Sequence, residues 1–257
     1  MHTRAHDIAE WLKARVTAAG ARGIAVGLSG GIDSAVVVGL AAMAMPGHVV
    51  GVMMPCHSDP QDETDARLAA DHFGVPAIRV DLGPSYDRLL EDLRQAATAL
   101  PPNLQPPATV DYDNDIRMRV PAANVKPRLR MTSLYFVANS LNYLVAGTGN
   151  RSELAIGYFT KYGDGGVDLL PIGRLLKSEV SVVARELEVP APIIDKPPSA
   201  GLWEGQTDES EMGFTYADLE KYLVNGPRAI APALGLRIER LETGSAHKRA
   251  LPPMPKA

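Results

Sequence analysis

The sequence has little cysteine, few aromatic residues and no long apolar segment. Cys56 is the only cysteine among 257 residues, which excludes an internal disulfide framework and a zinc site built from several cysteines. No uninterrupted apolar run approaches the roughly 20 residues that span a bilayer. The N-terminus carries an amphipathic pattern rather than a signal peptide. We therefore expect a protein of the reducing cytoplasm, in which Cys56 is a small buried residue rather than a nucleophile.

The sequence also lacks a strong charge of either sign. It carries 26 Lys and Arg residues against 30 Asp and Glu residues, for a formal net charge of −4. This balance gives no whole-chain signal for nucleic-acid binding, although residues 126–130 form a short basic stretch. Its 46% hydrophobic and 22% charged residues are typical of a globular protein with a sizeable core. We expect residues 1–257 to form a single domain, with neither nucleic acid nor a membrane as partner.

Hydrophobic periodicity predicts an alternation of strands and helices. Helices are predicted over residues 4–19, 33–45, 62–73, 87–100, 123–141, 174–187 and 216–224, and strands over 23–28, 49–54, 77–82 and 142–146. The less regular stretches are a Pro-rich loop (101–122), a Gly-rich loop (151–170), an extended segment (190–198) and a basic, Pro-rich tail (243–257). This order indicates an α/β fold with a doubly wound, mostly parallel sheet flanked by helices. Ligands of such sheets bind at the carboxyl ends of the strands.

The most informative stretch is Gly-Leu-Ser-Gly-Gly-Ile-Asp-Ser at residues 27–34. It is typical of a strand, a tight turn and a helix that starts near Asp33 and Ser34, either of which could cap that helix. Gly30 and Gly31 permit positive φ angles and leave room for a ligand, and the N–H groups of such a turn bind anions. No lysine follows the glycines as it does in the common phosphate loop. The turn therefore predicts a polyphosphate site, with Asp33 as a candidate metal ligand.

A second candidate stretch, residues 147–153, leaves the predicted strand that ends at Ala146. Thr148 can bond a nucleotide there, and Glu153 can bind Mg²⁺, which takes few protein carboxylates and completes its shell with phosphate and water. Taken alone, this stretch is more typical of an ordinary glycine turn with a solvated glutamate. Asp33 and Glu153 each follow a strand's carboxyl end, so together they favour a metal site.

A third stretch, residues 157–168, interleaves glycines with Lys161, Asp164 and Asp168 and adds three aromatic side chains. Such a loop can surround a flat, phosphorylated ligand, because aromatic faces stack on flat groups. The alternatives are a flexible surface loop or an acidic calcium loop. Lys161 and the absence of regularly alternating carboxylates argue against calcium.

These motifs resemble those of known nucleotide enzymes. Ser-Gly-Gly-x-Asp-Ser after a strand resembles the pyrophosphate loop of the ATP pyrophosphatase family. Six stretches in family order resemble the ammonia-dependent NAD⁺ synthetases: residues 27–34, 124–131, 147–153, 157–171, 196–213 and 247–249. They run from near residue 24 to near residue 249, so the match extends over almost the whole chain. The Phe-Thr-Lys-Tyr-Gly-Asp-Gly-Gly block separates this family from its relatives. The resemblance implies a Rossmann-like ATP pyrophosphatase fold and a homodimer.

The resemblance also implies roles for individual residues. The positions that match the family's ATP contacts are Gly27, Leu28, Ser29, Gly30, Gly31, Ile32, Asp33, Ser34, Thr148, Lys177 and Ser199. Those that match its deamido-NAD⁺ contacts are Arg128, Lys161, Asp168, His247 and Lys248. Asp33 and Glu153 match the Mg²⁺ ligands, and the candidate catalytic residues are Asp33, Lys177 and Asp168. Gly149-Asn150 stands where many members carry Asp-His, which is a departure from the family pattern.

The implied reaction is the last step of NAD⁺ biosynthesis. The nicotinate carboxylate of deamido-NAD⁺ attacks the α-phosphorus of ATP, and ammonia then attacks the resulting acyl adenylate. We expect catalysis by alignment and charge stabilisation, with Asp168 hypothesised to orient or deprotonate ammonium. Residues 155–170 and 199–213 are expected to order on binding. The chain contains no plausible glutaminase domain, so free ammonia is the expected nitrogen source.

Two other functions compete with this interpretation. The first is another ATP pyrophosphatase, such as a tRNA-thiolating or GMP-forming ligase. Thiolation usually needs further cysteines and tRNA favours basic patches, whereas this chain has one cysteine and is acidic overall. The second is a non-catalytic adenine-nucleotide-binding module. Two separated acidic metal candidates and the long Gly-rich loop argue against it, because binding alone needs neither.

Overall fold

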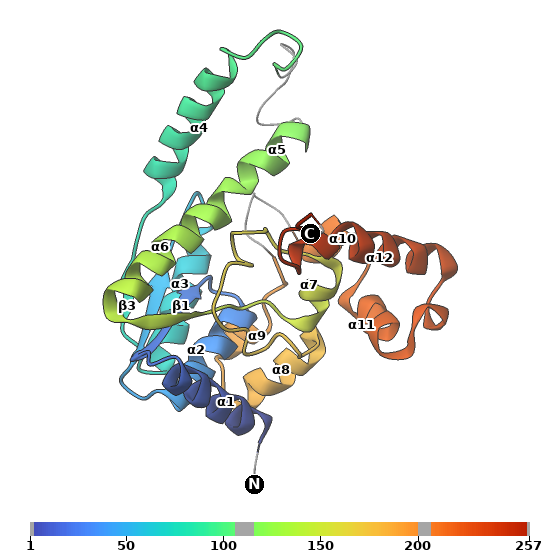
Figure 1. The fold of residues 1–257 in the computed structure, drawn as a ribbon. Helices are drawn as coiled ribbons and strands as arrows, with labels where there is room; N and C mark the ends of the chain where they lie inside the picture. The colour runs from blue at the N-terminus through green and yellow to red at the C-terminus, as the bar shows by residue number, and fades with distance from the viewer. Residues whose placement is uncertain (1–2, 106–115, 200–206, 256–257) are drawn as a thin grey trace.

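A parallel β-sheet forms the centre of the molecule. The computed structural model describes residues 3–105, 116–199 and 207–255. The strand order is β3-β2-β1-β4, and all three neighbouring pairs are parallel. The strands are β1 (Gly23–Leu28), β2 (Val49–Met53), β3 (Ala77–Arg79) and β4 (Tyr143–Ala146). The predicted doubly wound α/β sheet is confirmed (Figure 1).

Helices cover both faces of this sheet, because its strands are apolar on both sides. One face packs against α1 (Arg4–Ala18), α2 (Ile32–Ala44), α3 (Pro60–His72) and α8 (Lys177–Glu186), the other against α4 (Gly83–Ala97) and α6 (Val125–Leu141). Alternate residues of β1 serve the two layers: Ile24 and Val26 join the α2 side, and Ala25 joins the α6 side. This is the period of two that strand geometry imposes, and it explains the continuous apolar runs in the sequence.

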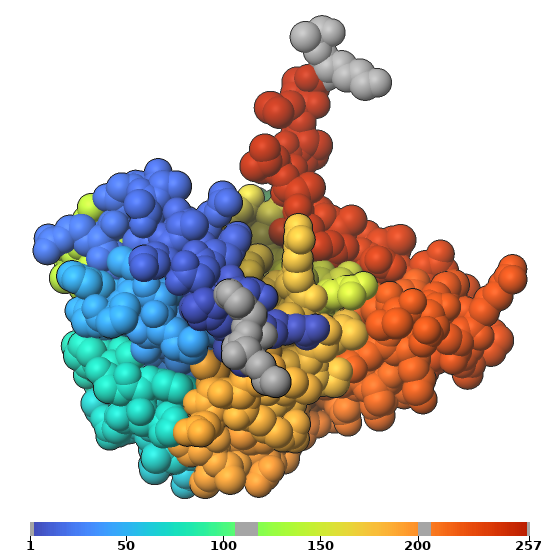
Figure 2. Space-filling model, turned by 90° about the horizontal axis from the view of Figure 1, so that it is seen from below, coloured from blue at the N-terminus to red at the C-terminus, as the bar shows by residue number. Residues whose placement is uncertain are grey.

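A third apolar cluster lies beyond one end of the sheet. It joins α7 (Arg151–Ile156), α11 (Tyr216–Asn225) and α12 (Pro232–Gly244) through Ile156, Leu219 and Ile238. The short elements α10 (Asp208–Met212), η1 (Pro227–Ala229) and η2 (Ala246–Lys248) belong to the same region. Figure 2 shows the last described residues projecting from the body, where Leu251 and Met254 are exposed.

The sheet changes direction between β1 and β4. The chain runs outward from β1 to β2 and β3, and then returns to place β4 on the other side of β1. The loops after β1 and β4 therefore diverge and leave a crevice at the carboxyl ends of these two strands. In doubly wound sheets this reversal point is where ligands bind.

Two predicted loops contain helices. Part of the predicted Pro-rich loop forms α5 (Ile116–Ala123), although Pro121 donates no backbone bond within it; residues 106–115 of that loop lie outside the described residues. The start of the predicted Gly-rich loop forms α7, because Asn150 and Glu153 make a capping box there. At α7 this local cap outweighs the loop-like composition, and at α5 the helix packs against α6.

Other differences concern the later part of the chain. The predicted extended segment 190–198 contains α9 (Ala191–Ile194), which has proline in its first turn. Neither α10 nor α12 is among the predicted helices. The remaining predicted helices and strands are confirmed to within a few residues at their ends, as is Gly74, which ends the predicted helix 62–73 with a φ of +63°. Within the described ranges, no helix is long and apolar enough to cross a membrane.

Candidate active site

A cavity of about 1380 Å³ opens at the carboxyl ends of β1 and β4. The turn after β1, the loop after β4 and residues near 157–167, 196–199 and 248–251 surround it. Most of the predicted ATP-binding residues line it: Gly27, Leu28, Ser29, Gly31, Ile32, Asp33, Thr148, Lys177 and Ser199. Segments far apart in the sequence therefore meet where the strand order predicts a ligand site.

The turn after β1 depends on glycine at position 30. Gly30 has a φ of +78°, and a Cβ atom there would lie 2.2 Å from the backbone oxygen of Asp62 in α3. A side chain would therefore meet both an unfavourable backbone conformation and a rigid neighbour. The turn leads directly into α2, whose N-terminal N–H groups favour an anion.

Hydroxyl groups brace the same turn from within. The backbone N–H of Ser29 donates to Ser34 Oγ at 3.3 Å, and Ser34 Oγ donates to the backbone oxygen of Gly31 at 2.9 Å. Gly31 is the N-cap of α2 and supplies no side-chain cap. The expected capping by Asp33 or Ser34 is thus wrong: the helix begins at Ile32, and Ser34 stabilises the turn instead.

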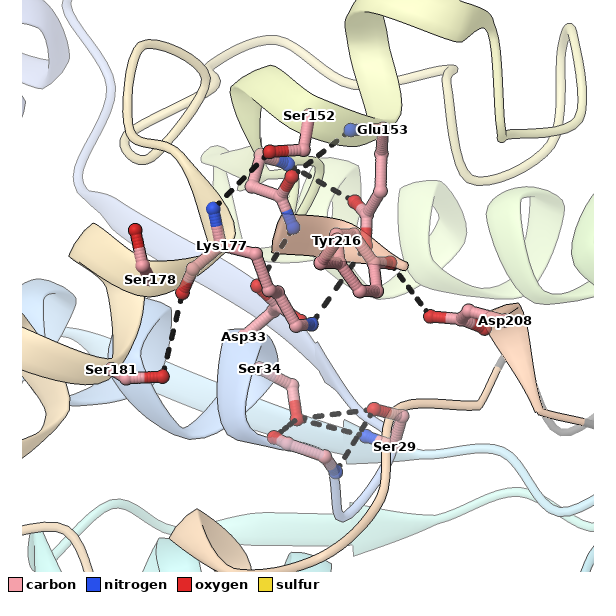
Figure 3. A network of polar contacts seen from close by, with 12 residues as sticks. Ser29, Asp33, Ser34, Ser152, Glu153, Lys177, Ser178, Ser181, Asp208 and Tyr216 are labelled. Carbon is pink, nitrogen blue, oxygen red and sulfur yellow. Dashed lines mark hydrogen bonds and ion pairs between the residues drawn. The ribbon is translucent and has the colours of Figure 1, made fainter. Parts of the chain in front are cut away.

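Lys177 joins the two predicted metal ligands (Figure 3). Its Nζ donates a hydrogen bond to Asp33 Oδ2 and lies 4.0 Å from Glu153 Oε1. Asn150 Nδ2 donates to the other oxygen of Asp33 at 3.2 Å. The Lys177 side chain is 10% exposed and each carboxylate 17%. Three helix starts, those of α2, α7 and α8, thus bring opposite charges together in a nearly closed environment.

The capping box of α7 fixes the direction of Glu153. The backbone N–H of Glu153 donates to Asn150 Oδ1 at 3.0 Å, and the backbone N–H of Asn150 donates to Glu153 Oε2 at 3.1 Å. The other oxygen of Glu153 faces Lys177. The starts of α7 and α8 are also joined, because the backbone N–H of Lys177 donates to Ser152 Oγ at 3.2 Å. Asn150 is fully buried, so this departure from the family pattern is built into the site.

Burial and neighbouring charges control the protonation of this cluster. Burial, reinforced by the Asp33 carboxylate, raises the pKa of Glu153 to about 8. Burial alone would lower the pKa of Lys177, but Asp33 and Glu153 outweigh it, so that the pKa of Lys177 is raised. Lys177 therefore carries its charge at neutral pH, and Glu153 is largely protonated until a second cation approaches.

The donor set at Asp33 and Glu153 fits Mg²⁺. Magnesium takes oxygen ligands, uses one or two protein carboxylates and fills its octahedron with phosphate and water. Asp33 and Glu153 supply two carboxylates at one wall of the cavity. The described residues contain no group of three or more acidic, His or Cys side chains arranged to hold a metal by themselves. The arrangement therefore suits a cation that arrives with phosphate oxygens.

The Gly-rich loop after α7 closes another side of the cavity. Thr160 Oγ1 donates to Asn124 Oδ1 at 2.7 Å, and the backbone N–H of Thr160 donates to Asp164 Oδ1 at 2.9 Å. Lys248 Nζ donates to the backbone oxygens of Gly157 and Phe159, both at 2.7 Å. The chain's last turns are therefore fastened to this loop.

The other residues predicted to contact deamido-NAD⁺ gather near this loop or beside it. Lys161 Nζ donates to the backbone oxygen of His247 at 2.8 Å, and Arg128 Nη2 donates to the backbone oxygen of Lys161 at 3.4 Å. Asp168 stands apart: Tyr135 donates its hydroxyl to one carboxylate oxygen at 2.9 Å, and the backbone of β4 donates to the other at 2.8 Å. Within this predicted set, Lys248 lines the cavity. The described residues that line it do not include Arg128, Lys161, Asp168 or His247.

Three groups at the site are not predicted from the sequence. Lys196 Nζ donates to Asp62 Oδ1 at 2.8 Å and to Asp65 Oδ2 at 2.5 Å, which fastens the segment before Ser199 to α3. Asp208 and Tyr216 lie behind Lys177 and are joined by a hydrogen bond of 2.8 Å. The acidic residues after Thr207 are a helix-start signal, but the pairings with distant residues have no signature in a single sequence.

The comparison with known proteins decides the family. The profile of the family described as NAD synthase matches residues 4–252. The chain belongs to the NAD synthase family. An NH(3)-dependent NAD(+) synthetase from Carboxydothermus hydrogenoformans is 49% identical over 252 residues, which cover 98% of this chain and 96% of that protein. The resemblance found in the motifs is thus confirmed over nearly the whole chain.

Solved structures agree with this NAD synthase assignment. A structure described as NMN synthetase from Francisella tularensis superposes with a TM-score of 0.86 at 34% identity, and covers 99% of this chain and 98% of its own. An NH3-dependent NAD synthetase from Campylobacter jejuni, in complex with the nitrate ion, has a TM-score of 0.76 at 26% identity, with 98% and 97% coverage. The predicted ATP pyrophosphatase fold is confirmed by these neighbours.

Proposed function

We propose that this cavity is where the chain carries out the reaction of its family, the ATP-dependent amidation of deamido-NAD⁺ by ammonia. A nicotinate carboxylate oxygen attacks the α-phosphorus of ATP, and the bond to the β-phosphate breaks, which gives an acyl adenylate and pyrophosphate. Ammonia then attacks the acyl carbon and loses a proton, and AMP leaves as NAD⁺ forms. The observation that carries the proposal is the meeting of the glycine turn with Lys177 in one cavity.

The phosphate side of the site acts on the leaving group. The turn at residues 29–31 and the start of α2 present backbone N–H groups to the pyrophosphate. Lys177 supplies a buried positive charge next to them, where the low dielectric strengthens its effect on the developing negative charge. Thr148 and Ser199 line the same cavity and contact the ATP molecule. The substrate carboxylate is the nucleophile, so these groups align and stabilise.

We assign the metal to Asp33 and Glu153. Bound Mg²⁺ would neutralise the phosphate charge as a Lewis acid. Asp33 and Glu153 would hold the ion through carboxylate oxygens, and Glu153 would give up its proton to do so. Lys177, whose Nζ donates to Asp33 Oδ2, would then contact phosphate oxygens.

The second substrate occupies the side of the site formed by the Gly-rich loop and the C-terminal residues around His247 and Lys248. Arg128, Lys161, His247 and Lys248 are proposed to hold deamido-NAD⁺. The contacts of Lys161 with His247 and of Lys248 with Gly157 and Phe159 support this, because they bring these residues to one loop. Asp168 is proposed to order that loop against β4 and to act on ammonium from there.

We further propose a cytoplasmic homodimer. Large apolar side chains are exposed along α4, α5 and α6, an arrangement typical of a surface that a partner covers. They are Leu89, Leu93, Val120, Phe136 and Leu141, with Phe136 75% exposed. Sedimentation of the purified chain would measure the dimer, and Phe136→Glu should shift it toward the monomer.

The assay of this proposal is pyrophosphate release with ATP, Mg²⁺ and deamido-NAD⁺, with and without ammonium. NAD⁺ should accumulate only with ammonium, and Asp33→Ala and Glu153→Ala should each abolish turnover in a folded protein. Nicotinate mononucleotide is tested in parallel, because one structural neighbour is described as an NMN synthetase. Release of orthophosphate, or rates independent of deamido-NAD⁺, would contradict the proposal. Faster turnover of nicotinate mononucleotide would show that the mononucleotide, and not deamido-NAD⁺, is the preferred substrate.

A further inference from the structure

The ring of Tyr216 is the third group around the Lys177 ammonium. Lys177 Nζ lies 5.4 Å from the ring centre, within the range of a cation–π interaction. The other two groups are the carboxylates of Asp33 and Glu153. In Figure 3 the ring lies between Lys177 and Asp208. The ammonium is thus enclosed by two acidic side chains and one neutral aromatic face.

Asp208 holds the ring of Tyr216 in this position. The Tyr216 hydroxyl donates to Asp208 Oδ2 at 2.8 Å, and the backbone N–H of Tyr216 donates to Glu209 Oε1 at 2.9 Å. Tyr216 is 7% exposed and packs with Ile156 and Leu219. A phenol bound at its hydroxyl and enclosed by apolar side chains has a fixed ring plane, so the face that it offers to Lys177 is fixed as well.

The carboxylate of Asp208 is costly to bury. Asp208 is 4% exposed, and its Oδ1 is a buried atom without a hydrogen-bond partner within the described residues. Its backbone N–H donates to the Pro198 oxygen at 3.1 Å. A buried acceptor that lacks a partner lowers stability, and apolar residues could fill this place. The negative charge also enriches the electron density of the phenol that it accepts from, which strengthens the attraction of its face for a cation.

Lys177 depends on the Tyr216 ring when Asp33 and Glu153 no longer contact its ammonium group. This step rests on the proposed function, in which Asp33 and Glu153 would hold the metal when ATP binds. The ammonium would then lose both acidic partners, and the Tyr216 ring would remain against it. An aromatic face attracts a cation without accepting its proton or neutralising it, so the full positive charge stays available to phosphate oxygens.

We propose that Tyr216 and Asp208 are positioning residues for Lys177. Asp208 fixes the phenol, and the phenol ring keeps the ammonium beside the leaving pyrophosphate. Neither residue touches the reacting atoms, and both act through Lys177.

The test compares ring variants with a matched tyrosine. Tyr216→Leu removes the face, Tyr216→Phe keeps it without the link to Asp208, and Asp208→Asn keeps an acceptor without the charge. Tyr222→Leu is the control, because Tyr222 lies on the same helix, packs on the same apolar cluster and contacts Glu242 with its hydroxyl at 3.4 Å. We expect Tyr216→Leu to lower kcat about tenfold with the KM for deamido-NAD⁺ unchanged, the Phe and Asn variants to fall between it and wild type, and the control to stay near wild type.

A double-mutant cycle separates positioning from general stabilisation. Binding of a non-hydrolysable ATP analogue with Mg²⁺ is measured in wild type, Tyr216→Leu, Lys177→Met and the double variant. The loss caused by Tyr216→Leu should vanish in the Lys177→Met background. An equal loss in both backgrounds, or an equal loss in Tyr222→Leu, would overturn the proposal. If Tyr216→Leu does not fold, Tyr216→Phe takes its place in the cycle. Failure of the wild type to release pyrophosphate with deamido-NAD⁺ would instead contradict the proposed function.

Discussion

The backbone oxygen of Asp62 in α3 closes directly over Gly30 in the turn after β1, 2.2 Å from where a Cβ atom would stand. The same stretch of α3 is fastened to the segment before Ser199 through Lys196, whose Nζ contacts Asp62 and Asp65. The turn that faces the phosphates is thus set by packing against α3 and not by its own sequence alone.

Replacing Gly30 by alanine should damage this turn selectively. Gly30→Ala forces a methyl group against a backbone oxygen at a φ of +78°, which we expect to cost about 2 kcal/mol and to weaken ATP binding at least tenfold. Gly31→Ala is the control for the stability measurement, because Gly31 has a φ of −92° and its added Cβ would meet only Ser29 Oγ, at 3.5 Å. Denaturant unfolding measures both variants, and ATP titration measures Gly30→Ala against wild type. Equal losses of stability in the two variants would refute this role of Gly30.

Asn150 should matter both to stability and to the charge cluster. Asn150→Ala removes the cap of α7 and the hydrogen bond to Asp33, so we expect a loss of about 1–2 kcal/mol in the free energy of unfolding and a lower kcat. Asn150→Asp keeps an oxygen for the cap but places a third carboxylate beside Asp33 and Glu153. It should retain the helix. The Mg²⁺ concentration that gives half-maximal turnover should differ from that of wild type. Wild-type stability of the Ala variant would show that the capping box is not needed.

Glu153 should make stability depend on pH. The pKa of Glu153 is raised in the folded chain to about 8. The stability that protonated Glu153 contributes is therefore complete below its pKa in the unfolded chain, near 4.5, and is lost as pH rises through 8. Glu153→Gln keeps a capping acceptor and removes the titration. We expect wild type to lose about 4 kcal/mol relative to this variant between pH 5 and pH 9 in metal-free buffer. Parallel pH profiles of urea unfolding for the two proteins would contradict this.

Lys248 should affect the second substrate more than ATP. Its Nζ bonds two backbone oxygens of the Gly-rich loop and lies 5.3 Å from the Phe159 ring centre. Lys248→Met leaves those oxygens without their donor, so the loop should exchange amide hydrogens faster at residues 157–160 and the KM for deamido-NAD⁺ should rise several-fold. Lys13→Met, on the exposed face of α1, serves as the control. A rise in the KM for ATP without a rise in the KM for deamido-NAD⁺ would contradict this role of Lys248.

The central fold was predictable because its signals are local. The runs at 23–28 and 49–54 are apolar throughout, which is typical of strands buried on both faces, and the glycine turn follows the first of them. The helix α7 carries a signal too, since Asn150 and Glu153 are three residues apart in a capping box. The sequence predicts Glu153 only as a metal ligand, whereas one of its oxygens caps the helix and the other faces Lys177.

The relationships that complete the site could not be found in this way. Lys196 meets Asp65 across 131 positions, and Tyr216 faces Lys177 from another helix. Such pairs follow from packing of elements whose positions a single sequence does not specify. The Pro-rich and Gly-rich compositions also misled the assignment of α5 and α7, because packing and capping outweigh weak local preferences.

The central claim is that the substrate carboxylate attacks the α-phosphorus of ATP in this cavity. The direct measurement uses deamido-NAD⁺ labelled with ¹⁸O in its nicotinate carboxylate, with ATP, Mg²⁺ and ammonium, and mass spectrometry of the AMP. One labelled oxygen should appear in the phosphate of each AMP, with the other retained in the amide of NAD⁺. Unlabelled AMP, or label in orthophosphate or pyrophosphate, would contradict the account.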